Sequence, residues 1–150
     1  MSESLIFLMG KYEARIPMDR WYSDNHLWLQ DDACGFRVGF TAYSVRMLQD
    51  VYFLDWTIDA NTLVRKKQEI GQIESSKAVS SLYAPADGRI LDFNPVVLND
   101  PSAINTDGYG TGWLFHQETE HKLLTAQEYV DLLSTKWEET QRLIKGQLND

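Results

Sequence analysis

Between Leu27 and Phe115, short runs of β-branched and aromatic residues alternate with turn residues, and no other feature limits the fold of this chain as strongly. The runs lie at residues 38–40, 51–54, 70–73, 82–83, 90–93 and 112–115, with Gly, Pro, Asn or Asp between them. Short strands with a turn signal about every ten residues are typical of small sandwiches and barrels. We therefore expect a mainly β core.

Two helices are expected beside this core. Thr41 is a suitable N-cap for a short helix over residues 42–49. Thr125 and Glu128 have the spacing of a capping box, and Gly146 is placed where a helix commonly ends. One apolar face follows from the spacing of Val130, Leu133, Trp137 and Ile144. The C-terminal helix should therefore pack against the β unit.

The length of 150 residues and the apolar content of 43% suit a single domain with its own core. We divide it into an N-terminal arm at 1–20, a β domain at 21–124 and a C-terminal helix at 125–147. The apolar run within Met1–Gly10 is too short to span a bilayer and follows no basic segment. We interpret it as a strand or docking arm, and expect a cytoplasmic protein without membrane contact.

Charge and residue types exclude several functions. A net charge of -8 argues against nucleic-acid binding, which needs clustered Lys and Arg. A single cysteine, Cys34, rules out an internal disulfide or a Cys-rich zinc site, and we expect it to be a buried small residue. The three histidines, His26, His116 and His121, lie in different blocks of the sequence, and no metal, P-loop or dinucleotide motif is present. We expect neither a metal site nor catalysis by the chain itself.

One lysine is set among small residues between two apolar runs. Lys77 follows Glu74, Ser75 and Ser76 and precedes Ala78, and the extended segments on either side predict a hairpin with Lys77 near its tip. Small polar residues suit such a turn and leave the amine accessible. By itself, this pattern is far more often that of an ordinary exposed lysine.

Five ordered blocks resemble the glycine-cleavage H protein family, a family of lipoyl carriers. They are His26-Leu27-Trp28, Val38-Gly39-Phe40-Thr41-Ala42-Tyr43, Glu74-Ser75-Ser76-Lys77-Ala78, Tyr83-Ala84-Pro85-Ala86-Asp87-Gly88-Arg89-Ile90, and Asp100-Pro101-Ser102-Ala103-Ile104-Asn105 with Tyr109-Gly110-Thr111-Gly112-Trp113-Leu114. The similarity extends from about Trp21 to the C-terminal helix. It implies a barrel-sandwich hybrid of two small antiparallel sheets, with the lipoyl lysine on an exposed hairpin.

The resemblance also implies the chemistry. Lipoate would be joined covalently to Lys77 by a lipoate-protein ligase or lipoyl transferase that reads Glu74, Ser75, Ser76 and Ala78 as the lipoylation motif. His26 is a candidate contact of the arm, although a structural role is the more common one for such a histidine. The cofactor would supply the chemistry and the protein its attachment. The implied partners are a pyridoxal-phosphate decarboxylase, a tetrahydrofolate-dependent aminomethyltransferase and dihydrolipoyl dehydrogenase, each met transiently by a monomer.

Five residues depart from the family pattern: Gln49 replaces Gly, Asp55-Trp56 replaces Leu-Pro, Ser76 replaces Val and Gly108 replaces Pro. With the arm from Leu5 to Arg20, Asp55 and Trp56 are candidates for partner choice. These departures leave two alternatives open. One is an H-like lipoate-binding protein that carries sulfur intermediates for a heterodisulfide-reductase-like complex in sulfur oxidation. The other is an interaction module that keeps the fold without lipoate.

Overall fold

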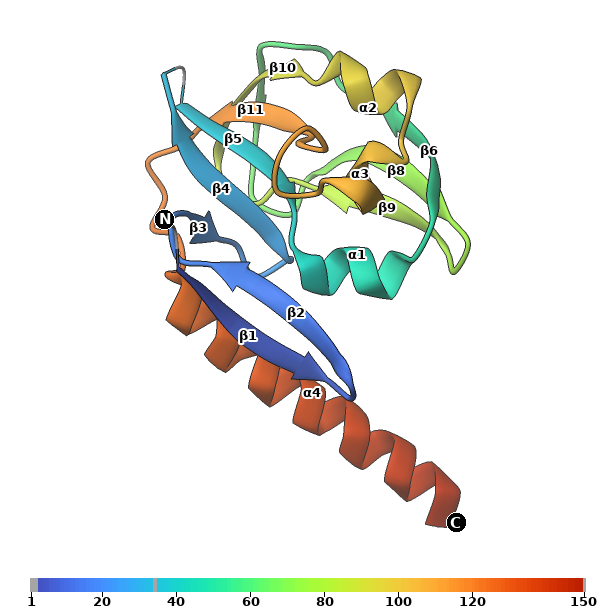
Figure 1. The fold of residues 1–150 in the computed structure, drawn as a ribbon. Helices are drawn as coiled ribbons and strands as arrows, with labels where there is room; N and C mark the ends of the chain where they lie inside the picture. The colour runs from blue at the N-terminus through green and yellow to red at the C-terminus, as the bar shows by residue number, and fades with distance from the viewer. Residues whose placement is uncertain (1–2, 34, 150) are drawn as a thin grey trace.

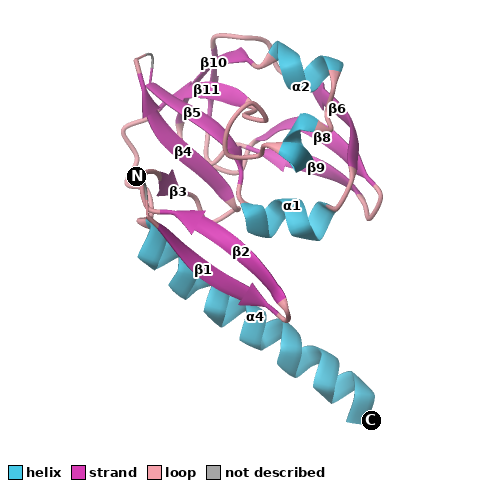
Figure 2. Cartoon of the chain, viewed as in Figure 1, coloured by secondary structure: helices cyan, strands magenta, loops and turns pink. Residues whose placement is uncertain are grey.

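Three antiparallel sheets and four helices form the part of the chain that the computed structural model describes, residues 3–33 and 35–149 (Figure 2). Side chains are described as far as Glu138, so the expectations for Cys34 and Ile144 lie outside the described residues. The strands are β1 (Ser4–Met9), β2 (Tyr12–Pro17), β3 (Trp21–Tyr22), β4 (Leu27–Asp32), β5 (Gly35–Phe40), β6 (Val51–Trp56), β7 (Thr62–Val64), β8 (Glu69–Ser75), β9 (Val79–Tyr83), β10 (Gly88–Phe93) and β11 (Phe115–Glu118). The helices are α1 (Ala42–Leu48), α2 (Pro95–Asn99), α3 (Ala103–Thr106) and α4 (Ala126–Asn149).

Two of these sheets build the main body. One has six strands in the order β3-β4-β5-β11-β10-β7, and the other has three in the order β6-β8-β9. Apolar side chains from both sheets, among them Leu29, Ile73 and Ile90, fill one buried cluster. This arrangement confirms the expected mainly β, antiparallel fold.

One predicted run is not a strand. Only Phe115 of the run 112–115 is in a strand, because β11 begins there and residues 112–114 precede it. The Gly112 N–H donates to the Asp107 carbonyl at 2.9 Å, and a Cβ at Gly112 would lie 2.4 Å from the Ala103 carbonyl oxygen. The close packing of this turn against α3 keeps Gly112 out of the ladder.

Both predicted helix starts are confirmed by their caps. The Thr41 hydroxyl accepts a hydrogen bond from the Ser44 N–H at 3.3 Å. The Thr125 N–H donates to Glu128 Oε1 at 3.0 Å, and the Glu128 N–H donates to Thr125 Oγ1 at 3.2 Å. The predicted end at Gly146 is wrong, because α4 continues to Asn149. A glycine inside a helix costs only about 1 kcal/mol, so it does not have to end one.

The N-terminal segment forms a hairpin, β1–β2, that lies along α4 (Figure 1). Its inward side chains, including Phe7, Ala14 and Ile16, share a second buried cluster with Tyr129 and Leu133 of α4. On the opposite face, Ile6 and Leu8 are exposed. No helix among the described residues is long and apolar enough to cross a membrane.

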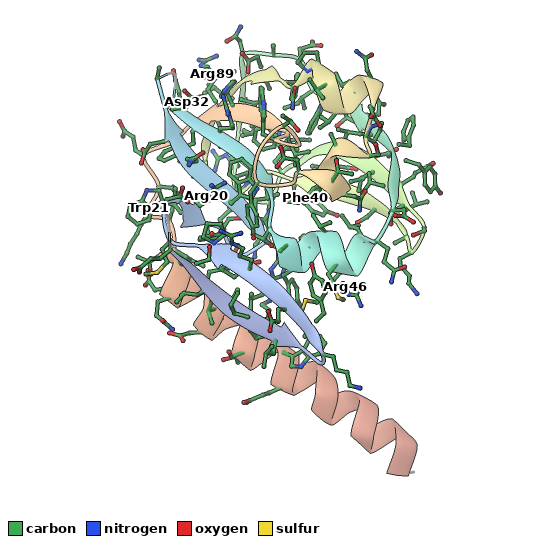
Figure 3. All side chains as sticks on the ribbon, viewed as in Figure 1. Arg20, Trp21, Asp32, Phe40, Arg46 and Arg89 are labelled. Atoms are coloured by element: carbon green, nitrogen blue, oxygen red, sulfur yellow. The ribbon has the colours of Figure 1, made fainter. Side chains whose placement is uncertain are left out.

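Arg20, three residues after the hairpin, holds the segment that leaves it against the main body (Figure 3). Its guanidinium lies 4.8 Å from the Trp28 ring centre and 5.2 Å from that of Tyr109, and it donates to the Tyr109 carbonyl at 3.2 Å. At the other end of the hairpin, Arg46 of α1 lies over the Tyr12 ring at 4.5 Å. One stacked arginine thus holds the turn of the hairpin, and another holds the segment that follows it.

Candidate functional site at the Lys77 turn

Lys77 lies in the turn between β8 and β9, which projects from the edge of the molecule opposite the N-terminus (Figure 1). The residue is exposed. Within the described part of the chain, its Nζ takes part in no recorded hydrogen bond or ion pair. An acylating reagent therefore meets an amine that is not held by a protein partner.

Ser75 holds the turn together from the inside. It is only 5% exposed, and its Oγ accepts the N–H groups of Lys77 and Ala78, both at 3.3 Å. Its own N–H donates to the Ala78 carbonyl at 2.9 Å. A hydroxyl in this position satisfies donors that a tight turn would otherwise leave unpaired. Ser75 therefore determines the direction in which Lys77 leaves the sheet.

Ser76 ties the same turn to a different part of the chain. Its N–H donates to the Asp50 carbonyl at 2.9 Å, and its Oγ accepts the Asp50 N–H at 3.2 Å. Asn105 of α3 braces that segment, because its side chain accepts the Val51 N–H at 2.9 Å and donates to the Gln49 carbonyl at 2.5 Å. The residue before Lys77 is thus anchored to the start of β6.

The other two motif residues flank the turn. Glu74 is half-buried and pairs with Phe53 on β6 and Val79 on β9. Ala78 is exposed, and its methyl group offers no polar contact. The structure therefore brings Glu74, Ser75, Ser76, Lys77 and Ala78 into one compact site.

His26 lies in a different environment. Its Nδ1 is 2.9 Å from the Tyr129 hydroxyl, and its ring centre is 4.8 Å from that of Tyr43. Burial, helped by the positive charge of Lys136, lowers the pKa of His26 to about 4, so the ring is neutral near pH 7. The recorded contacts of its ring in the described structure are with α1 and α4 and not with the Lys77 turn. A contact with the arm therefore stays a prediction.

A small cavity of about 70 Å³ lies beside the strand that follows Lys77. Ser81, Leu82 and Tyr83 of β9 form one wall, and the other lining residues are Asn25, Leu27, Phe40, Ile70, Leu114 and Phe115. None of these described lining residues is charged. Asn25 secures the wall through a hydrogen bond from its Nδ2 to the Tyr83 carbonyl at 3.0 Å.

Two positions that the sequence left ambiguous now have clear surroundings. Trp56 packs its ring against Phe93 at 4.7 Å and Phe115 at 5.6 Å, so it fills the core more than it offers a partner surface. Asp55 is exposed.

Sequence reasoning missed Asp50 and Asn105 as supports of the turn, because neither lies near Lys77 in the sequence. Among the described residues, no group of three or more His, Cys, Asp or Glu side chains could hold a metal ion.

These features define a small β domain that presents Lys77, a lysine without a recorded side-chain partner, on a braced hairpin. Comparison with known proteins agrees with this class. The family model described as "Glycine cleavage H-protein" matches residues 20–136. The glycine cleavage system H protein of Thermobifida fusca is 34% identical over 120 residues, which cover 78% of this chain and 94% of the relative.

Two further relatives extend the comparison. A probable glycine cleavage system H protein of Natronomonas pharaonis is 37% identical over 118 residues, with 76% of this chain and 93% of the relative covered. The crystal structure of a glycine cleavage system H protein from Mycobacterium marinum superimposes with a TM-score of 0.70 at 36% identity, and covers 79% of this chain and 99% of its own. This chain belongs to the glycine cleavage H-protein family. The hairpin β1–β2 lies before the matched region.

Proposed function

We propose that Lys77 carries a covalently bound lipoyl group and that the protein is a non-catalytic carrier. The observation that carries this proposal is the exposed, unpartnered Nζ of Lys77 on a turn held by Ser75 and Ser76. Membership of the glycine cleavage H-protein family supports it.

The site fits the cofactor. Acylation converts the ammonium group of Lys77 into a neutral amide, and no recorded ion pair of the described structure is lost by this change. Ser75, Ser76 and Ala78 are small, so they leave space for an acyl chain around the amine. When bound, lipoate supplies a disulfide that can accept and release a group and be reoxidised. The chain itself supplies the attachment point and its orientation.

The cargo that we propose is the aminomethyl group produced by glycine decarboxylation. The relatives are glycine cleavage system H proteins, which supports a pyridoxal-phosphate decarboxylase as donor, a tetrahydrofolate-dependent aminomethyltransferase as acceptor and dihydrolipoyl dehydrogenase for reoxidation. The acidic surface, with a net charge of -8, suits steering toward basic entrances on such enzymes.

The uncharged cavity favours a second candidate. An aminomethyl amine is cationic near neutral pH, yet the lining of this cavity contains no carboxylate among the described residues. A cargo without positive charge fits such surroundings better. The sulfur-carrying, H-like lipoate-binding protein of a heterodisulfide-reductase-like system is the alternative that meets this condition.

Intact mass of the protein purified from its natural host tests the attachment. We expect the mass increase of one lipoyl group, and its complete loss in the Lys77→Arg variant. An unmodified wild-type protein would instead favour an interaction module without lipoate, and a lipoyl group that persists in Lys77→Arg would place the site elsewhere.

Reconstitution tests the cargo. Lipoylated protein with the pyridoxal-phosphate decarboxylase should support exchange of carbon dioxide into glycine, and Lys77→Arg protein taken through the same lipoylation is the control. Lack of exchange by fully lipoylated wild-type protein would exclude the aminomethyl cargo and favour the sulfur carrier.

A further inference from the structure

A row of three side chains crosses the sheet next to the Lys77 turn. Phe53 on β6 pairs with Glu74 on β8, which in turn pairs with Val79 on β9. Directly paired residues in a sheet point to the same face. Phe53 is 44% exposed and Val79 is 72% exposed, so two apolar side chains flank one carboxylate on the open face.

The turn itself has little that another protein could recognise. Ser75 is buried, and its hydroxyl is occupied by backbone groups of the turn. The Ser76 hydroxyl accepts a bond from Asp50, and Ala78 has only a methyl group. The nearest paired row of distinctive, accessible side chains is therefore formed by Phe53, Glu74 and Val79.

The charge on this face has one sign. Asp55 lies two residues after Phe53, where the alternation of a strand returns to the same face, and it pairs with uncharged Gln72. Asp55 is exposed, and Glu74 is half-buried. A partner that approaches Lys77 over this sheet therefore meets apolar groups and carboxylates.

We propose that Phe53, Glu74 and Val79 form the docking surface for the enzyme that acylates Lys77, an inference that rests on the proposed attachment of lipoate. The partner should present an apolar contact for Phe53 and Val79, with a Lys or Arg placed to meet Glu74. That enzyme must bind the lysine turn from outside, and this row is continuous with it.

The reaction to be followed has two balanced steps. Lipoate and ATP form a lipoyl adenylate and pyrophosphate on the enzyme. The Lys77 amine then attacks the acyl carbon, an amide bond forms, and AMP and a proton are released. The rate of this transfer reports docking directly, because it requires no later partner.

The test uses the full-length protein before lipoylation with purified lipoate-protein ligase, lipoate and ATP, and intact mass measures initial rates. The double variant Phe53→Ser with Val79→Ser should raise KM for the protein about tenfold or more while kcat changes little, since apolar anchors at the centre of an interface supply much of its affinity. Glu74→Lys should also raise KM for the protein, because it places a positive charge opposite the expected Lys or Arg of the enzyme. Phe53→Leu should restore most of the affinity that Phe53→Ser removes.

Leu63→Ser is the matched control, because Leu63 is 67% exposed on β7 of the other sheet. It should be lipoylated at the wild-type rate. A wild-type kcat/KM for the double variant would overturn the docking surface, whereas failure of the wild-type protein itself to gain a lipoyl group would count against the proposed function. If the melting temperature of the double variant falls, Val79→Lys is tested instead, because Val79 is exposed on an edge strand. This variant should also raise KM, and an unchanged KM would overturn the docking surface.

Discussion

Gln49 has a backbone conformation, φ 60° and ψ -136°, that favours glycine, and it stands between α1 and the segment that anchors the Lys77 turn. A side chain in this region strains the backbone. Its carbonyl accepts a hydrogen bond from Asn105, which helps to hold the conformation. The departure from glycine that the sequence shows at this position therefore has an energetic cost close to the Lys77 turn.

We expect Gln49→Gly to stabilise the protein by about 1 kcal/mol, because the replacement removes this strain. Urea unfolding at neutral pH measures the change. Gln72→Gly, at an exposed position within β8, is the control and should destabilise the protein. A loss of stability in Gln49→Gly would show that Gln49 makes compensating contacts.

His26 makes stability dependent on pH. Its pKa is lowered from 6.5 to about 4 by burial and by Lys136, and Asp24 opposes this shift. Between these two values, the unfolded chain binds a proton that the folded chain does not, so stability falls as the pH is lowered from about 6.5 to 4. The lowered pKa of His26 corresponds to a stability change of about 3 kcal/mol over this range.

His26→Asn should flatten this part of the stability profile, since Asn tolerates the positive φ of 70° at this position and does not titrate. Urea unfolding between pH 7 and pH 4 provides the measurement, and exposed His121→Asn is the control. Below pH 4 we expect a further loss of stability, which comes from Asp32. A backbone hydrogen bond from Ala33 and the His116 side chain lower the pKa of Asp32, so the unfolded chain binds a proton at this carboxylate before the folded chain does. An unchanged slope in His26→Asn would contradict the assignment to His26.

At the scale of helices and strands, the sequence predicted those elements that a local residue pattern specifies. Runs of β-branched and aromatic residues located β5, β6, β8, β9 and β10, and cap residues located the starts of α1 and α4. The short helices α2 and α3 were missed, since four or five residues show no period. At the site, the Lys77 turn followed from its neighbours, but its attachment to Asp50 did not, because that contact joins residues 26 positions apart.

The hairpin β1–β2 should contribute to stability only through its inner face. Ile16 is fully buried against α4, whereas Ile6 is 49% exposed on the other face. We expect Ile16→Ala to cost about 2 to 4 kcal/mol, and Ile6→Ala, its matched control, to cost well under 1 kcal/mol. Thermal unfolding of both variants measures this. Equal costs would mean that the two faces are buried alike in solution.

For the whole molecule, the structure predicts that modification of Lys77 stays local. The turn lies at the opposite side of the molecule from the N-terminus, and the buried clusters of the main body and of the hairpin with α4 are separate. Lipoylation should shift backbone amide resonances in β8, β9 and the cavity lining, and leave those of β1, β2 and α4 in place. Shifts spread through α4 would instead reveal a conformational response.

The attachment of Ser76 to Asp50 gives the lysine turn a fixed pivot. Because the attachment point is held in place, a lipoyl group on Lys77 would reach only the space around this turn. For a partner docked beside this turn, the tethered group is present at a high effective concentration, set by the length of the arm. If Lys77 carries the proposed lipoyl group, the Ser76 hydroxyl would thus influence how often that group meets a docked enzyme.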